Sequence, residues 1–233
     1  MEIGEIISDA IKYPLNNMKA LLIYIVLSII MSLALIIGGV SALGADQGSS
    51  FGVLAIFGII IALIVYFLIE GYMLDVIKFA IAKDQGSPEI DIARQVINGI
   101  KYIVLSIIYF IIPIIIIMLL SRWETLALII RLILFIVFGL AFLMAACKLA
   151  ETESLGAALN IGEAIKDISR VGIVKILAII IVLVVLAFII GLIVNIFGND
   201  GILGIIGAII NGICSVYLTF FYNRAIGLAY SDA

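Results

Sequence analysis

Six long apolar runs constrain the fold of this chain more than any other feature of its sequence. They cover residues 20–43, 51–73, 102–120, 126–147, 174–194 and 202–222. Each has about 20 residues, the length that an α-helix needs to cross the roughly 30 Å hydrocarbon core of a bilayer. Hydrophobic residues make up 66% of the 233 residues and charged residues 12%, whereas a soluble domain is about half apolar and about a quarter charged. We therefore predict an all-α membrane protein with six transmembrane helices.

Short polar segments between alternate runs predict that these helices pair as three hairpins. The turns are expected at residues 44–50, 121–125 and 195–201. An amphipathic stretch precedes each hairpin, and these stretches are residues 1–17, 87–101 and 155–168. Apolar residues at helical spacing opposite charged ones are typical of helices that lie in the membrane interface. We expect these interfacial helices on the cytoplasmic side.

Local patterns predict several helix boundaries. Tyr13-Pro14 is expected to end the first amphipathic helix, because the residue before a proline disfavours helical geometry. Ser87-Pro88-Glu89 is expected to begin the second one, with a capping hydroxyl, a proline at the first position and an acid in the first turn. Pro113 predicts a kink in the third span. Residues 223–233 are expected to form a short tail.

A four-residue pattern occurs three times, each time near the point where an amphipathic stretch leads into an apolar run. It reads acid or amide, small residue, Ile, Lys, at residues 9–12, 98–101 and 163–166. This pattern predicts one integral membrane domain over residues 1–233, built from three repeats. The repeats are residues 1–83, 84–150 and 151–233. Chance similarity in Ile-rich sequence is the alternative.

Basic residues predict the orientation in the membrane. Of the 13 Lys and Arg residues, all but Arg122 and Arg131 fall on the side that holds both termini. Because cytoplasmic loops carry the excess of Lys and Arg, both termini are expected in the cytoplasm and the protein in the cell membrane. No small-residue cleavage site is evident near the first run, so no removable signal peptide is expected.

A series of short motifs resembles a known family. The series is Tyr13-Pro14, Gly71-Tyr72, Pro88-Glu89, Asn98-Gly99-Ile100-Lys101, and Tyr109 with Pro113. In this order it resembles an uncharacterised archaeal membrane family, the domain of unknown function numbered four thousand and thirteen. The resemblance implies a multi-pass membrane protein, and it brings no assigned activity, ligand or catalytic residue.

The residue types disfavour catalysis and metal binding. The chain has no His, which removes the commonest general base and the commonest metal ligand. Cys147 and Cys214 lie in or beside apolar runs without a neighbouring Cys, so they are interpreted as small buried side chains. The formal net charge of −3 comes without a basic block, which disfavours a nucleic-acid partner. We expect no enzyme activity, no metal and no cofactor.

Three polar residues within the apolar runs are candidates for an intramembrane site, because polar groups there are costly. Glu70 is either an ion or proton site or a carboxylate at the interface. Arg131 either binds a substrate or reaches towards the outer interface. Asn211 either hydrogen-bonds across a helix contact at the stripe Gly204, Ala208 and Gly212, or lines a pathway.

The repeated lysines are candidates for a lipid surface. Lys12, Lys101 and Lys166 could form a basic ring that binds anionic lipid headgroups. The simpler interpretation is that they only set the orientation in the membrane.

Two functional hypotheses follow from these features. The first is a non-enzymatic membrane organiser that binds lipids or membrane proteins. The second is a small permease or carrier with a site near the bilayer midplane, which repeats and broken helices build in transporters. The sequence does not predict an oligomeric state.

Overall fold

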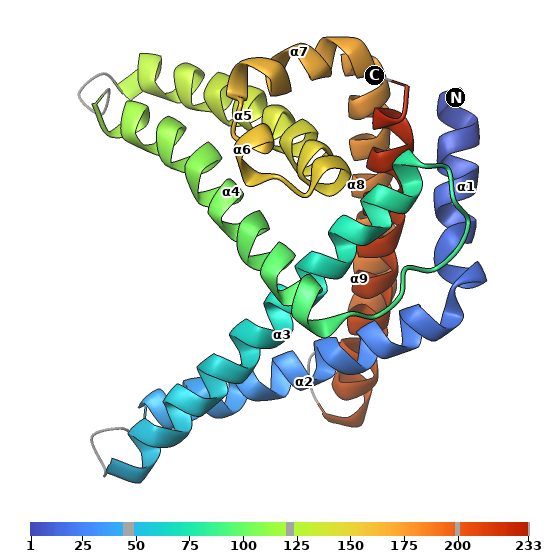
Figure 1. The fold of residues 1–233 in the computed structure, drawn as a ribbon. Helices are drawn as coiled ribbons and strands as arrows, with labels where there is room; N and C mark the ends of the chain where they lie inside the picture. Colours follow the sequence, from blue (N-terminus) through green and yellow to red (C-terminus); the bar gives the residue numbers. More distant parts are fainter. Residues whose placement is uncertain (44–48, 120–123, 199–200, 233) are drawn as a thin grey trace.

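The computed structural model describes residues 1–233 except 44–48, 120–123, 199–200 and 233. The described residues form nine helices and no strand (Figure 1). The helices are α1 (Ile3–Asn16), α2 (Met18–Leu43), α3 (Ser49–Ile81), α4 (Ile92–Leu119), α5 (Glu124–Thr152), α6 (Leu155–Ala158), α7 (Ile161–Val171), α8 (Ile173–Asn195) and α9 (Gly201–Tyr230). The long helices α2, α3, α4, α5, α8 and α9 contain six segments that are long and apolar enough to cross a membrane. The predicted all-α class with six membrane-long helices is confirmed.

The six long helices pack in pairs, as α2 with α3, α4 with α5, and α8 with α9. Figure 1 shows these hairpins diverging from a shared region, which we call the base. Both chain ends lie at the base, where the Met1 ammonium lies 2.5 Å from the Asp232 carboxylate. The far ends of the hairpins point away from one another.

Helix α3 is the centre of the base, since it packs against α2, α4, α5 and α9. Its residues 71–77 are all buried. Two glycines bring the backbones of α3 and α4 into contact. A Cβ atom at Gly71 would lie 1.8 Å from the Gln95 carbonyl oxygen, and one at Gly99 would lie 1.9 Å from that of Phe67. Only glycine permits this approach, as in other close crossings of membrane helices.

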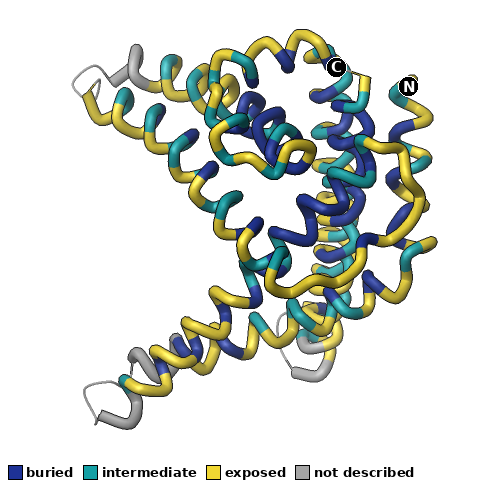
Figure 2. Tube along the Cα trace, in the orientation of Figure 1, coloured by how far each residue is buried: buried dark blue, intermediate teal, exposed yellow. Residues whose placement is uncertain are grey.

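Burial is concentrated at the base, and the arms of the hairpins are exposed (Figure 2). In the most apolar part of each span, only 11% to 28% of the residues are buried within the protein. An apolar surface of this extent would be unstable in water but suits lipid, where it needs no covering by the chain itself. The chain is therefore a multi-pass membrane protein.

Two predicted boundaries around the first two amphipathic stretches are wrong. Helix α1 continues through Pro14 to Asn16, because Tyr13 and Pro14 are both buried against the base. Helix α4 begins at Ile92 and not near Ser87. Its N-terminal cap is Asp91, whose carboxylate accepts a hydrogen bond of 3.1 Å from the Arg94 amide.

The predicted tail is wrong as well, because α9 continues to Tyr230. A Cβ atom at Gly227 would lie 2.6 Å from the Cβ of Ala80, so this last part of α9 packs tightly on α3. Arg224 is fully buried there. The sequence predicts Arg224 in the short tail, whereas the structure gives it partners from distant parts of the chain.

The three predicted joins differ in structure. Asn17 separates α1 from α2, and Gly172, with a φ of 93°, separates α7 from α8. The second amphipathic stretch is instead continuous with its span in α4. The third is divided into α6 and α7. The internal repeat and the interfacial position of these helices stay predictions.

Candidate functional site

Among the described residues, five polar or charged side chains are buried, and they belong to the base. They are Asp75, Gln95, Asn98, Asp167 and Arg224. A buried charge is tolerated only where ion pairs and hydrogen bonds compensate for its lost hydration. Asp75 accepts from Arg94, Asp167 accepts from Arg170 and Tyr230, and Arg224 donates through two of its three guanidinium nitrogens.

The first cluster joins α3 to α4. The Arg94 guanidinium donates two hydrogen bonds to the Asp75 carboxylate, of 2.7 Å and 3.0 Å. The Gln95 amide donates a third bond to Asp75, of 2.9 Å, and another to the Glu89 carbonyl, of 3.0 Å. The planar guanidinium fits the carboxylate with two parallel bonds, which fixes orientation as well as distance.

The second cluster joins α9 to α1. Arg224 Nε donates to the Asp9 carboxylate over 2.8 Å, and another guanidinium nitrogen donates to the Asp84 carbonyl. The guanidinium carbon also lies 4.5 Å from the centre of the Tyr13 ring, a cation–π contact. Burial raises the pKa of the Tyr13 hydroxyl, so this group remains neutral. It donates to the Gly86 carbonyl over 3.1 Å.

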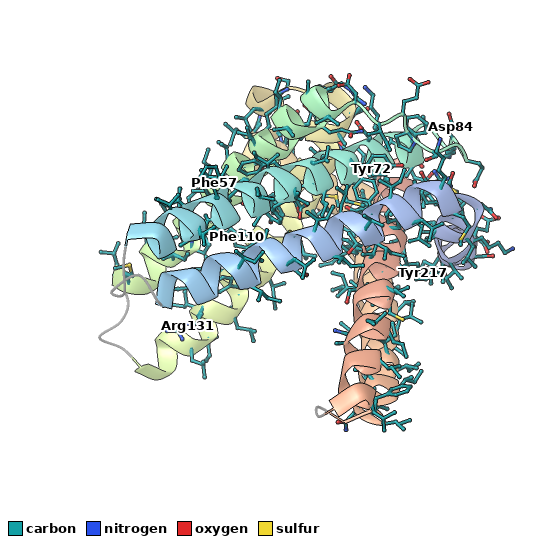
Figure 3. All side chains as sticks on the ribbon, turned by 90° about the horizontal axis from the view of Figure 1, so that it is seen from below. Phe57, Tyr72, Asp84, Phe110, Arg131 and Tyr217 are labelled. Atoms are coloured by element: carbon teal, nitrogen blue, oxygen red, sulfur yellow. The ribbon has the colours of Figure 1, made fainter. Side chains whose placement is uncertain are left out.

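These bonds fix the segment 82–91, in which the sequence predicts only a helix start at Ser87. Tyr72 of α3 adds a hydrogen bond of 3.0 Å to the Ser87 hydroxyl. Side chains from α1, α3, α4 and α9 therefore all bind this segment. Figure 3 shows Tyr72 on α3 and Asp84 beyond the end of that helix.

A third cluster surrounds Glu153, directly after α5. Lys78 Nζ lies 2.6 Å from its carboxylate, and this hydrogen bond lowers the pKa of Glu153 below its usual value. Lys101 Nζ donates to the Glu153 carbonyl over 3.0 Å and to the Asn98 side chain over 3.2 Å. This cluster links α3, α4 and α5.

The three lysines predicted as a lipid surface lie on different helices. Lys12 is exposed on α1 and Lys166 is exposed on α7. Lys101 of α4 is half-buried, and its ammonium binds Glu153 and Asn98 as described. Lipid binding by the three lysines stays a prediction, and Lys101 has in addition a clear structural role.

The three predicted intramembrane residues do not share one site. Glu70 lines a cavity between α2, α3 and α9. Arg131 is exposed on α5, on the arm of the second hairpin (Figure 3). Asn211 is exposed on α9 and does not line the cavity, although its neighbour Gly212 does.

The predicted packing of another helix on the α9 stripe Gly204, Ala208 and Gly212 stays a prediction. A Cβ atom at Gly212 would meet nothing within 4 Å, and Ala208 is exposed. Gly207 makes the close contact instead, since a Cβ there would lie 3.1 Å from the Cβ of Phe197. Gly207 lies on another face of the helix, so this close contact within the chain lies beside the stripe and not on it.

The cavity beside Glu70 has a volume of about 310 Å³ and several hydroxyl groups in its wall. The polar residues lining it are Tyr24, Ser28, Ser32, Tyr66, Glu70, Ser215 and Thr219. Sequence reasoning identified Glu70 and missed the hydroxyls. The pairs at positions 28 and 32 and at positions 215 and 219 have the i, i+4 spacing of one helix face, which could have revealed them.

The fold and these clusters define a six-span helical membrane protein with a buried polar network at its base. The family model described as "Protein of unknown function (DUF4013)" matches residues 54–199, which is more than half of the chain. The chain belongs to this family, and its archaeal origin stays a prediction. The match contains the first cluster and Glu70, whereas Tyr13-Pro14 and Arg224 lie outside it. No curated protein and no solved structure matches the chain.

Proposed function

We propose that the protein is a non-enzymatic membrane organiser, which binds lipids or membrane proteins between and around its diverging hairpins. The observation that carries this proposal is the contrast between the base and the arms. At the base, buried ion pairs and glycine contacts fix the angles of the helices. Along the arms, most apolar residues are not buried by the rest of the chain.

The hairpins diverge, and their exposed surfaces are therefore open to lipids or other proteins. A compact six-helix bundle would cover its own inner faces, but hairpins that diverge leave them open (Figure 1). In a bilayer, lipid chains or helices of another protein must fill the space between the arms. Helix association in lipid depends on close packing rather than on hydrophobicity. A fixed angle between the arms therefore favours those lipids or helices whose shape fits the space between them.

The distribution of charge supports an orientation with the base in the cytoplasm of the cell. Lys78, Arg94, Lys101 and Arg224 belong to the clusters of the base, whereas Arg131 lies on an arm. This is the bias of the positive-inside rule.

Crosslinking within native membranes tests the organiser. A diazirine-bearing residue replaces Ile107 of α4, whose side chain is 56% exposed, or Leu105 of the same helix, which is fully buried. We expect Ile107 to yield a reproducible adduct with one protein or lipid class, and Leu105 to yield only crosslinks within the chain. Recovery of the Ile107 variant without any defined adduct would contradict the proposal.

A carrier is the second candidate, and the cavity at Glu70 is the observation that favours it. The cavity includes a carboxylate and lies between three spans. Carriers place polar groups at such positions to bind their substrate within the membrane. Because Asn211 does not line the cavity, the site of this candidate is at Glu70. Uptake of a solute into proteoliposomes by the wild-type protein, lost in Glu70→Gln, would support a carrier. The absence of uptake by the wild-type protein would exclude it.

A further inference from the structure

We propose that the cavity between α2, α3 and α9 binds a primary ammonium group, with Glu70 as its counter-ion. The proposal concerns binding alone, so it does not depend on transport or on a protein partner. It follows from the charge, the hydrogen-bonding groups and the size of the cavity.

The cavity has an acidic side chain and no basic one. Among the residues that line it, Glu70 carries a carboxyl group, and no Lys or Arg is present. Glu70 precedes Asp75 on α3 by five residues, which places it about 8 Å farther from the base along the helix. An ionised carboxylate at such a position in a membrane is costly unless a cation accompanies it. A cationic ligand would supply the missing charge.

The hydroxyl groups favour a ligand that donates hydrogen bonds. The Ser32 hydroxyl donates to the Ser28 carbonyl over 2.8 Å, and the Thr219 hydroxyl donates to the Ser215 carbonyl over 2.9 Å. Their protons are thus used within their own helices, and their oxygens retain lone pairs that accept. A primary ammonium offers three N–H donors to these oxygens and to the carboxylate, whereas a quaternary ammonium offers none.

Tyr24 forms a closed, aromatic part of the wall. Its side chain is 1% exposed, and its ring packs on those of Tyr72 and Phe220, with centroids 4.3 Å and 5.7 Å away. Its hydroxyl is shielded from the cavity, so the hydrogen-bonding groups for a ligand are Glu70 and the serine and threonine hydroxyls. The half-buried ring of Tyr66 lines the same cavity and is suited to an adjacent cation.

The size of the cavity favours an organic cation over a metal ion. A volume of about 310 Å³ is at the lower end for small-molecule sites and is far larger than one bare ion. Met31, Ile69, Met73 and Val216 form an apolar part of the wall, which suits a short alkyl chain. A free alkylamine and an aminoethyl lipid headgroup share this chemistry.

Calorimetric titration tests the site directly. n-Butylammonium chloride is titrated at neutral pH into the full-length protein in phosphatidylcholine nanodiscs. We expect saturable binding that neither sodium chloride nor tetramethylammonium chloride displaces at equal concentration. Glu70→Gln should weaken binding at least about tenfold, since it removes a charged hydrogen-bond partner. Thr219→Val should weaken it about threefold, since it removes one neutral acceptor.

Glu151→Gln is the matched control, because Glu151 is exposed near the end of α5 and does not line the cavity. It should bind as the wild type does. Repeating the titration in phosphatidylethanolamine nanodiscs identifies the source of the ammonium. Weaker binding of n-butylammonium there indicates that the lipid headgroup competes for the site, and unchanged affinity indicates that the site takes a free amine. Absence of saturable binding, equal binding of tetramethylammonium, or equal loss in the two carboxylate variants would overturn the proposal.

Discussion

At the scale of single residues, glycine decides how closely the helices of the base approach. Gly71→Ala would place a Cβ atom 1.8 Å from the Gln95 carbonyl oxygen, a backbone atom that cannot rotate away. Helices α3 and α4 would have to separate, and we expect a cost of about 1–3 kcal/mol, typical of overpacking. The measurement is the melting midpoint of the detergent-purified protein, which should fall by several degrees.

Gly139→Ala on α5 is the control for this prediction. A Cβ atom at Gly139 would meet nothing within 4 Å. Alanine is also the better helix former, by about 0.5–1 kcal/mol, so this variant should melt at the wild-type temperature or slightly above it. Equal destabilisation by both substitutions would show that the contact between α3 and α4 is not as close as described.

Arg224 is the second residue that we expect to be critical for the base. Arg224→Met removes the donor to the Asp84 carbonyl and the charged donor to the Asp9 carboxylate, which keeps only the hydrogen bond from the Gln85 side chain. Breaking a buried ion pair by removal of one partner costs about 3–5 kcal/mol. We expect a large loss of thermal stability or of folded protein in the membrane.

Lys83→Met is the comparison, because the Lys83 side chain is 52% exposed and its pair with Asp232 spans 3.5 Å. Such surface pairs contribute about 0–1 kcal/mol. A wild-type melting temperature in Arg224→Met would contradict the proposed role of this ion pair. Sequence reasoning could not find this role, since Asp9 and Arg224 are 215 positions apart and no local pattern connects them.

At the scale of helices, α4 begins at a different residue from the one that the sequence pattern predicts. Ser87-Pro88-Glu89 has the residues of a good helix start, but the Ser87 hydroxyl binds Tyr72 and Asp91 caps the helix. Asp91→Ala should therefore cost about 1 kcal/mol and accelerate hydrogen exchange of the first amides of α4. Ser87→Ala should leave those amides unchanged, and the opposite pattern would place the helix start at Ser87.

The spans themselves could be predicted because apolar length alone determines them. Their ends could not, because tertiary contacts decide where polar residues remain helical. Helix α9 extends to Tyr230 since Arg224 and Gly227 find partners on other helices. The same reasoning applies to the cavity. A lone carboxylate in an apolar run identifies Glu70, but serines and threonines there are common, and only the fold shows which ones gather beside it.

At the scale of the whole molecule, we expect the base and the tips of the hairpins to lie on opposite sides of the membrane. Ser8 on α1 is exposed at the base, and Ile196, directly after α8, is 81% exposed. Single cysteines at these positions, in a chain with Cys147 and Cys214 changed to Ala, report the two sides. Because the basic residues of the base favour the cytoplasm, a membrane-impermeant maleimide on intact cells should label Ile196→Cys, and Ser8→Cys only after lysis. Labelling of Ser8→Cys alone would reverse the orientation, and labelling of both without lysis would contradict six membrane crossings.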